Sequence, residues 1–166
     1  MSRLIRILAI ILSLLGPLAA TSHAHAADKA GGGEACTLLT KQDAVNALGQ
    51  DVEGPRDTKV GASVMPNTVA SACEYQGTGA GIRSVNLNVW RSTAAGQMTQ
   101  MGQIVCARKK RDGLAGLGDI ACWYNDQHEE LQVYKGAVFI SVELRGLRDP
   151  TEAIQKVAKA ALSRLH

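Results

Sequence analysis

The sequence predicts an α+β fold, an antiparallel sheet of about five strands with helices packed on one face, in the order α-ββ-α-βββ-α. Alternating apolar and polar residues recur in short segments, which is typical of strands with one buried face. Connections of hairpin length join the strands within each group, and such short connections indicate antiparallel neighbours. Helical patterns precede, separate and follow the two strand groups, so sheet and helices are expected to form two layers.

The first helix and the first two strands can be placed from their ends. Residues 40–43 (TKQD) resemble a helix cap, and an apolar stripe follows as far as Gly49, which ends the helix. Residues 50–68 contain several glycines and prolines and predict a loop with at most one short strand. Strands are expected over 69–76 and 82–91, joined by a glycine-rich turn.

A second helix is expected between the two strand groups. Ser92 or Thr93 can cap it, it runs to about Arg111, and Gly113 ends it. Helical spacing turns one set of apolar residues inward: Met98, Met101, Val105 and Cys106. This helix therefore has a stripe that needs an apolar partner.

Three strands and a final helix complete the predicted fold. The strands are expected over 119–124, 130–135 and 137–144, and a tight turn at Lys135-Gly136 joins the last two. Residues 149–152 (DPTE) supply a capping aspartate, a proline at the first helical position and a glutamate at the third. An apolar stripe follows them to the end of the chain, which predicts a helix packed on the sheet.

Residues 1–26 predict an export signal. A short positive start is followed by an apolar run over 7–15 that is too short to span a bilayer, and the small residues required by a signal peptidase follow at Ala24-His25-Ala26. We expect cleavage before Ala27, a flexible leader over 27–35 and a single domain over 36–166. No lipid-attachment motif follows the apolar run, so a soluble periplasmic or secreted protein is expected.

The charge of the mature chain argues against nucleic acid as a partner. Removing Arg3 and Arg6 from the 18 Lys and Arg residues leaves 16, against 15 Asp and Glu residues. A net charge near zero provides no general attraction for a polyanion. No later apolar run is long enough to predict a transmembrane span in the mature chain.

Export places the four cysteines, Cys36, Cys73, Cys106 and Cys122, in an oxidising compartment, where an even number predicts disulfides. Three connectivities are possible, and one pair could instead stay reduced and buried. We favour Cys36–Cys73 and Cys106–Cys122, because each bond would join a helical segment to the first strand that follows it. No CxxC spacing occurs, which argues against zinc and redox motifs.

The polar phase of the strand over 82–91 is the candidate binding surface. Asn86, Asn88 and Trp90 alternate with an apolar set, so they share the face opposite the core. An exposed tryptophan among amides is typical of a sheet face that binds a sugar or a peptide. The alternative is that Trp90 is covered by a loop or helix of its own chain.

Two clusters of charged residues have both a functional and a purely structural interpretation. The run Arg108-Lys109-Lys110-Arg111 is a candidate for an anionic partner, but cations at a helix C-terminus are also favoured by the macrodipole. Residues 126–130 (DQHEE) have the residue types of metal ligands, but polar residues also favour a solvated turn. We expect a solvated turn at 126–130, with no metal and no cofactor.

The sequence has no recognisable catalytic motif. His128 and His166 are the histidines of the mature chain, and neither a GxSxG nor an HExxH pattern occurs. The glycine-rich segments 77–81 and 113–118 both lead into predicted strands, whereas a phosphate loop leads into a helix. We therefore expect a protein that is not an enzyme.

Several short motifs resemble a family of small bacterial envelope proteins. They are a Cys-Thr-Leu-Leu-Thr segment at 36–40, Cys-Glu-Tyr at 73–75, Gly-Leu-Gly-Asp at 116–119 and the strand-Lys-Gly-strand hairpin. Many members of that family are actinobacterial lipoproteins, and its domain is named only as one of unknown function. The resemblance implies an exported, cysteine-bridged α+β domain and brings no catalytic residue. This chain departs from those lipoproteins by lacking the lipid-attachment motif.

Together these observations predict a non-catalytic envelope accessory protein that binds another envelope component, either a protein or a glycan. An enzyme with an unrecognised active site and an inhibitory domain that blocks a partner protein are the alternatives. The sequence does not encode a recognisable oligomeric state.

Overall fold

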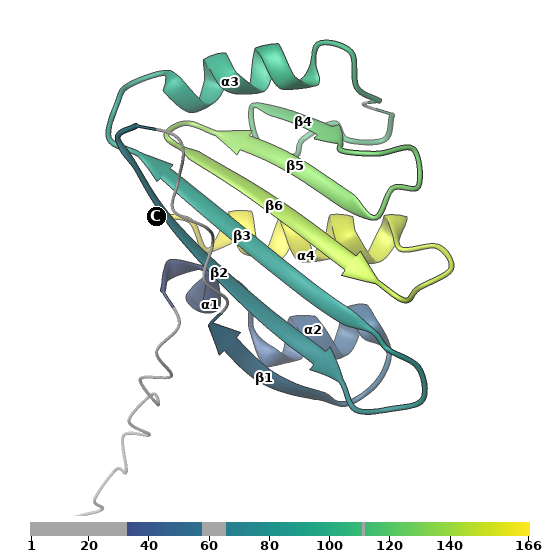
Figure 1. Cartoon of the computed structure of the whole chain (residues 1–166). Coiled ribbons are helices and arrows are strands. Elements are labelled where there is room, and N and C mark those ends of the chain that lie inside the picture. Colours follow the sequence, from purple (N-terminus) through teal and green to yellow (C-terminus); the bar gives the residue numbers. More distant parts are fainter. Residues whose placement is uncertain (1–32, 58–65, 111) are drawn as a thin grey trace, which may run out of the picture.

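Within the described residues, 33–57, 66–110 and 112–166, the computed structural model contains one antiparallel sheet of six strands in the order β1-β2-β3-β6-β5-β4 (Figure 1). The strands are β1 (Val52–Asp57), β2 (Thr68–Gly77), β3 (Ser84–Ser92), β4 (Ile120–Trp123), β5 (Glu130–Lys135) and β6 (Val138–Arg145). The helices in the same residues are α1 (Glu34–Leu38), α2 (Lys41–Leu48), α3 (Gln97–Cys106) and α4 (Thr151–Ser163). The α+β fold is confirmed. The expected count of about five strands is corrected to six, because β1 pairs with β2 in the segment expected to be mainly loop.

The pairing of β3 with β6 joins the two strand groups at the centre of the sheet. Val89 lies opposite Ile140, and Trp90 lies opposite Phe139. The predicted tight turn connects β5 to β6, and Gly136 has a φ of 56° there, a left-handed conformation that glycine adopts without steric cost. Because β3 and β6 are distant in the sequence, their pairing decides which side chains of the two groups become neighbours.

Helices α1, α2 and α4 cover one face of the sheet, behind the strands in Figure 1. The main core lies between these layers and contains alternate residues of the central strands, among them Val85, Leu87, Val89, Ile140, Val142 and Leu144. Helix α4 buries Ile154, Val157, Ala158, Ala161 and Leu162 against it. A fully buried aliphatic side chain stabilises a fold by about 1.5–3 kcal/mol, so this layer is the main source of stability.

A second, smaller core lies on the opposite face, where α3 packs beside β4 and β5 (Figure 1). Its buried members are Met98, Cys106, Cys122, Tyr134 and Phe139. Gly102 allows the close approach of α3, because a Cβ at this position would lie 2.7 Å from the Tyr134 ring. The expected packing on one face thus holds for α1, α2 and α4. Helix α3 differs because its apolar stripe meets the aromatic residues of the opposite face.

The bounds of α3 differ from the expected helix at both ends. Ser92 is the last residue of β3, and its hydroxyl bonds Gln97 Oε1 at 2.6 Å rather than capping a helix. The helix begins after Gly96, which has a φ of 73°, and ends at Cys106. The described part of the cationic run, residues 108–110, therefore follows the helix instead of forming its last turn, and Gly113 does not end it.

Both predicted disulfides are present, and they tie helices to the two faces of the sheet. Cys36–Cys73 joins α1 to β2 on the side of the main core, and Cys106–Cys122 joins α3 to β4 in the smaller core. Each helical layer that packs on the sheet thus has one covalent bond to it.

The structure describes only part of the N-terminal segments that the sequence predicts. The export signal, its cleavage before Ala27 and most of the leader lie outside the described residues. The last part of the expected leader is folded, since Glu34 and Ala35 begin α1, Ala35 is fully buried and Glu34 forms an ion pair with Arg91. Among the helices of the described ranges, none has the length and apolar character needed to cross a membrane.

Candidate functional site

The sheet face opposite α1, α2 and α4 carries the residues predicted for binding, and we call it the open face. Helix α3 covers it only toward β4 and β5 (Figure 1). Strand register arranges its side chains in rows that cross β3, β6 and β5. The row nearest α3 is aromatic and consists of Trp90, Phe139 and Tyr134, whose adjacent rings stack with centroids 4.6 Å apart.

The next two rows of the open face are polar. Asn88, Ser141 and Gln132 lie beside one another on β3, β6 and β5. The row beyond them, which we call the acidic row, adds a residue from β2 and consists of Glu74, Asn86, Glu143 and Glu130. The open face thus changes from aromatic to amide and hydroxyl groups, and then to carboxylates.

Hydrogen bonds hold two carboxylates of the acidic row, Glu130 and Glu143, in place. Glu130 Oε1 accepts from Ser141 Oγ at 2.7 Å and from Gln132 Nε2 at 3.4 Å. Glu143 Oε1 accepts from Arg145 Nε at 2.7 Å, and this hydrogen bond raises the pKa of Arg145. Burial and the nearby charge of Glu130 raise the pKa of Tyr134 to about 12. The charge of Glu130 therefore reaches Tyr134 in the aromatic row.

Two buried acceptors among these side chains have no donor. Asn86 Oδ1 and Gln132 Oε1 are shielded from solvent and make no hydrogen bond within the described residues. Gln132 is only 8% exposed, and its amide points toward the acidic row because its Nε2 donates to Glu130. A buried acceptor without a donor costs about 1–3 kcal/mol, so both atoms favour the arrival of an N–H or O–H group.

The three residues predicted for binding share this face, as the alternation indicated. Asn86 and Asn88 are half-buried among polar neighbours, whereas Trp90 packs partly into the smaller core and stacks on Phe139. Trp90 is therefore not a freely exposed ring. Sequence reasoning missed Gln132 and Glu143, although the period-two pattern of their strands placed both on the polar phase.

The cationic run is engaged with its own chain where it is described. Lys109 Nζ donates to the Tyr124 carbonyl at 2.7 Å and lies 4.7 Å from the centre of the Tyr124 ring. Lys110 forms an ion pair with Asp126 at 3.0 Å, and Arg111 lies outside the described residues. Two of the four candidate cations thus have internal partners, which weakens the run as an anion site.

The side chains of the polar segment 126–130 do not come together in one site. Asp126 pairs with Lys110, His128 stacks on the Trp123 ring, and Glu130 belongs to the acidic row. Across the ranges that the structure describes, no group of three or more His, Cys, Asp or Glu side chains is arranged to hold a metal ion.

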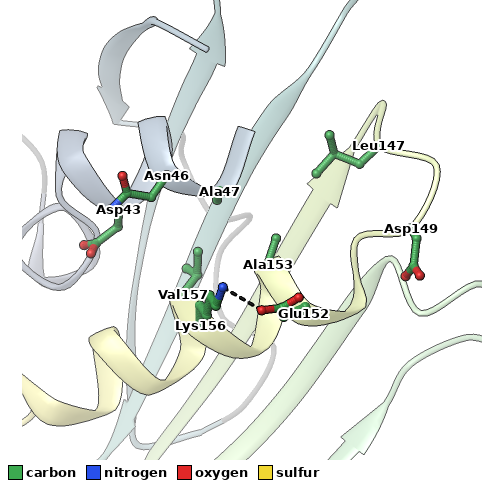
Figure 2. A pocket seen from close by; sticks show the side chains of 9 residues that line it. All are labelled: Asp43, Asn46, Ala47, Leu147, Asp149, Glu152, Ala153, Lys156 and Val157. Carbon is green, nitrogen blue, oxygen red and sulfur yellow. Dashed lines mark ion pairs between the residues drawn. The ribbon is translucent and has the colours of Figure 1, made fainter. Parts of the chain in front are cut away.

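A hollow of about 300 Å³ lies between α2 and α4, a site that sequence reasoning missed because the two helices are far apart in the chain (Figure 2). It is lined by Asp43, Asn46, Ala47, Leu147, Asp149, Glu152, Ala153, Lys156 and Val157. Lys156 pairs with Glu152 at 2.6 Å and lowers the pKa of that carboxyl. Asp43 is engaged by Arg164 at 2.7 Å, so two of the three acids around the hollow already have a cation.

Comparison of the chain with protein-family models, with curated proteins and with solved structures finds no match. The choice between the two surfaces therefore depends on their chemistry. The α2–α4 hollow is lined by acids that are mostly paired. The open face has buried acceptors without donors and is the stronger candidate site.

Proposed function

We propose that this protein is a non-catalytic accessory protein of the bacterial envelope that binds another envelope component through its open face. The observation that carries this proposal is the pair of acceptors that lack a donor within the described residues, on a sheet face that no helix of those residues covers completely. The second face of an antiparallel sheet is commonly solvated, and its polar side chains are then exposed. Here Gln132 is nearly buried and still lacks a donor for Oε1, which favours a surface built for a partner.

The disulfides support the envelope location in this proposal. Cys36–Cys73 and Cys106–Cys122 need an oxidising compartment, either the periplasm or the extracellular space. The export signal expected over residues 1–26 would deliver the chain there. The resemblance to small envelope proteins points to the same location.

Site-specific photocrosslinking in the exporting cell tests the proposal. A photoreactive phenylalanine is placed at Asn88, in the middle of the open face, or at Lys159, an exposed position of α4 on the opposite layer. We expect a discrete crosslinked product from position 88 and none from position 159. Disulfide formation in both variants verifies that they fold. The proposal is overturned if position 88 gives no product, or if both positions give the same one.

A further inference from the structure

The charges of the open face are predominantly negative. Glu74, Glu130 and Glu143 lie in one row across β2, β5 and β6. Two cations accompany these carboxylates, since Arg145 bonds Glu143, and Arg56 on β1 lies opposite Glu74 and pairs with Glu53. With Glu53 included, four carboxylates accompany two guanidinium groups, and Glu130 is bonded by neutral donors. The surface around the acidic row therefore attracts a cation and repels phosphate or carboxylate groups.

The buried polar atoms of the open face that lack a hydrogen-bond partner within the described residues are both acceptors. Asn86 Oδ1 and Gln132 Oε1 are both acceptors, and the carboxylates beside them can only accept when ionised. A ligand that satisfies them must supply several donors. Side-chain rotation must accompany binding, because both amide oxygens are shielded by their neighbours in the unbound protein.

The aromatic row is separated from the acidic row by Asn88, Ser141 and Gln132, and it offers a peptide segment that extends across the open face a surface suited to a planar donor. Trp90 is half-buried and stacks on Phe139, so part of its side chain stays exposed. Guanidinium groups stack on aromatic rings and carry five N–H donors in one plane. Carboxylates accept such a group in a bidentate geometry that a lysine ammonium cannot match.

We infer that the open face binds an arginine-bearing peptide segment of the partner, with the guanidinium on the acidic row. This inference rests on the proposed function and specifies the chemistry of its partner. A divalent metal is disfavoured, since no suitable group of ligands converges within the described residues. A neutral glycan also supplies donors and its hydroxyl groups can bond the three glutamates, but it does not neutralise their negative charge.

The probe is the acetylated peptide amide Gly-Arg-Gly-Arg-Gly, and its control replaces each arginine by citrulline, a neutral residue of nearly the same shape. Titration is followed by amide NMR shifts of the full mature protein. We expect shifts at Asn86, Gln132 and Glu143, and affinity for the arginine peptide at least about tenfold above that for the citrulline peptide. Affinity should also fall as salt is raised.

Matched variants locate the site. Glu130→Gln combined with Glu143→Gln should weaken the arginine peptide about tenfold or more, because both carboxylates lose their charge. Asp149→Asn combined with Glu152→Gln removes the same charge from the α2–α4 hollow and should leave affinity within about twofold, since charges this distant are screened. The inference is overturned if the hollow variant loses binding instead, if citrulline binds equally well, or if a neutral envelope oligosaccharide shifts the same amides more strongly than the arginine peptide.

The two proposals fail in different ways. If position 88 crosslinks a partner but the arginine peptide does not bind the open face, the binding function stands and the cationic chemistry is wrong. If position 88 yields no crosslink and the arginine peptide still binds, the acidic row is a cation site without a role in envelope binding.

Discussion

Glu130 and Glu143 lie directly opposite each other on β5 and β6, so two carboxylates occupy adjacent positions of one row on the open face. Like charges in directly opposed positions destabilise a sheet. Each carboxylate has its own donors, from Ser141 and Gln132 on one side and from Arg145 on the other. The protein thus keeps a repulsive pair on its surface, as is common where a site serves binding rather than stability.

Replacing Glu130 by Gln should therefore stabilise the protein. The amide oxygen of glutamine can still accept from Ser141, while the repulsion with Glu143 disappears. We expect a gain of about 0.2–1 kcal/mol in the free energy of unfolding at low salt. Urea denaturation measures it, and the gain should shrink in 1 M salt, where charges are screened within about 3 Å. A loss of stability would mean that the charge of Glu130 is needed by its two donors.

Asp43 should make stability depend on pH in the acidic range. Burial alone would raise the pKa of Asp43, but hydrogen bonds from Arg164 and Thr40 outweigh it, so the pKa lies below its ordinary value. The folded state binds a proton less readily than the unfolded state, so this contribution is present above about pH 4 and is lost as pH falls through the lowered pKa. Asp43→Asn should cost about 1–3 kcal/mol at pH 7, because it removes the ion pair with Arg164 and leaves a single, neutral oxygen to accept the hydrogen bonds of the capping box.

Denaturation of the wild type and Asp43→Asn across pH 2–7 checks this expectation, and the two curves should converge at the acidic end. Glu152→Gln is the matched control, since its ion pair with Lys156 is exposed on α4 and should matter little. Curves that stay parallel down to pH 2 would contradict the assigned role of Asp43.

The two disulfides should contribute unequally. Cys36–Cys73 closes a separation of 37 residues and Cys106–Cys122 one of 16 residues. In the chain-entropy model these loops correspond to about 4 and about 3 kcal/mol of stability, respectively. Urea denaturation of the paired Cys→Ala variants measures both. The reverse order would show that packing of α3, rather than loop closure, dominates the effect of the second bond.

Trp90→Ala should destabilise the protein, in contrast to the exposed ring that the alternation suggested. The indole stacks on Phe139 and packs partly into the smaller core, so its removal should cost about 1–3 kcal/mol. Trp90→Phe should recover most of this loss because it keeps a ring on the stack. Thermal and urea unfolding provide the comparison, and an unchanged stability for Trp90→Ala would place the ring outside the core.

Local patterns account for the parts of the fold and of the candidate site that could be predicted. The capping box at Thr40 and Asp43, the strand over 130–135 and the shared face of Asn86 and Asn88 each depend on neighbouring residues, and their periods follow from the geometry of helix and strand. The disulfide pairing was predicted as well, on the premise that each bond joins a helical segment to the first strand after it. Cys106–Cys122 fits that premise, whereas Cys73 lies on β2, the second strand after α1.

Pairings between distant segments decided the rest. Asn88 lies beside Ser141 only because β3 pairs with β6, and the acidic row exists only because β2, β3, β6 and β5 are adjacent in that order. Helix α3 packs closely against Tyr134, and Trp90 packs against the smaller core that they form. The alternation of apolar and polar residues in the sequence determined which side chains of a strand share the face opposite the core. Tertiary structure determined which of them meet, because contacts between strands depend on long-range pairing that no local period encodes.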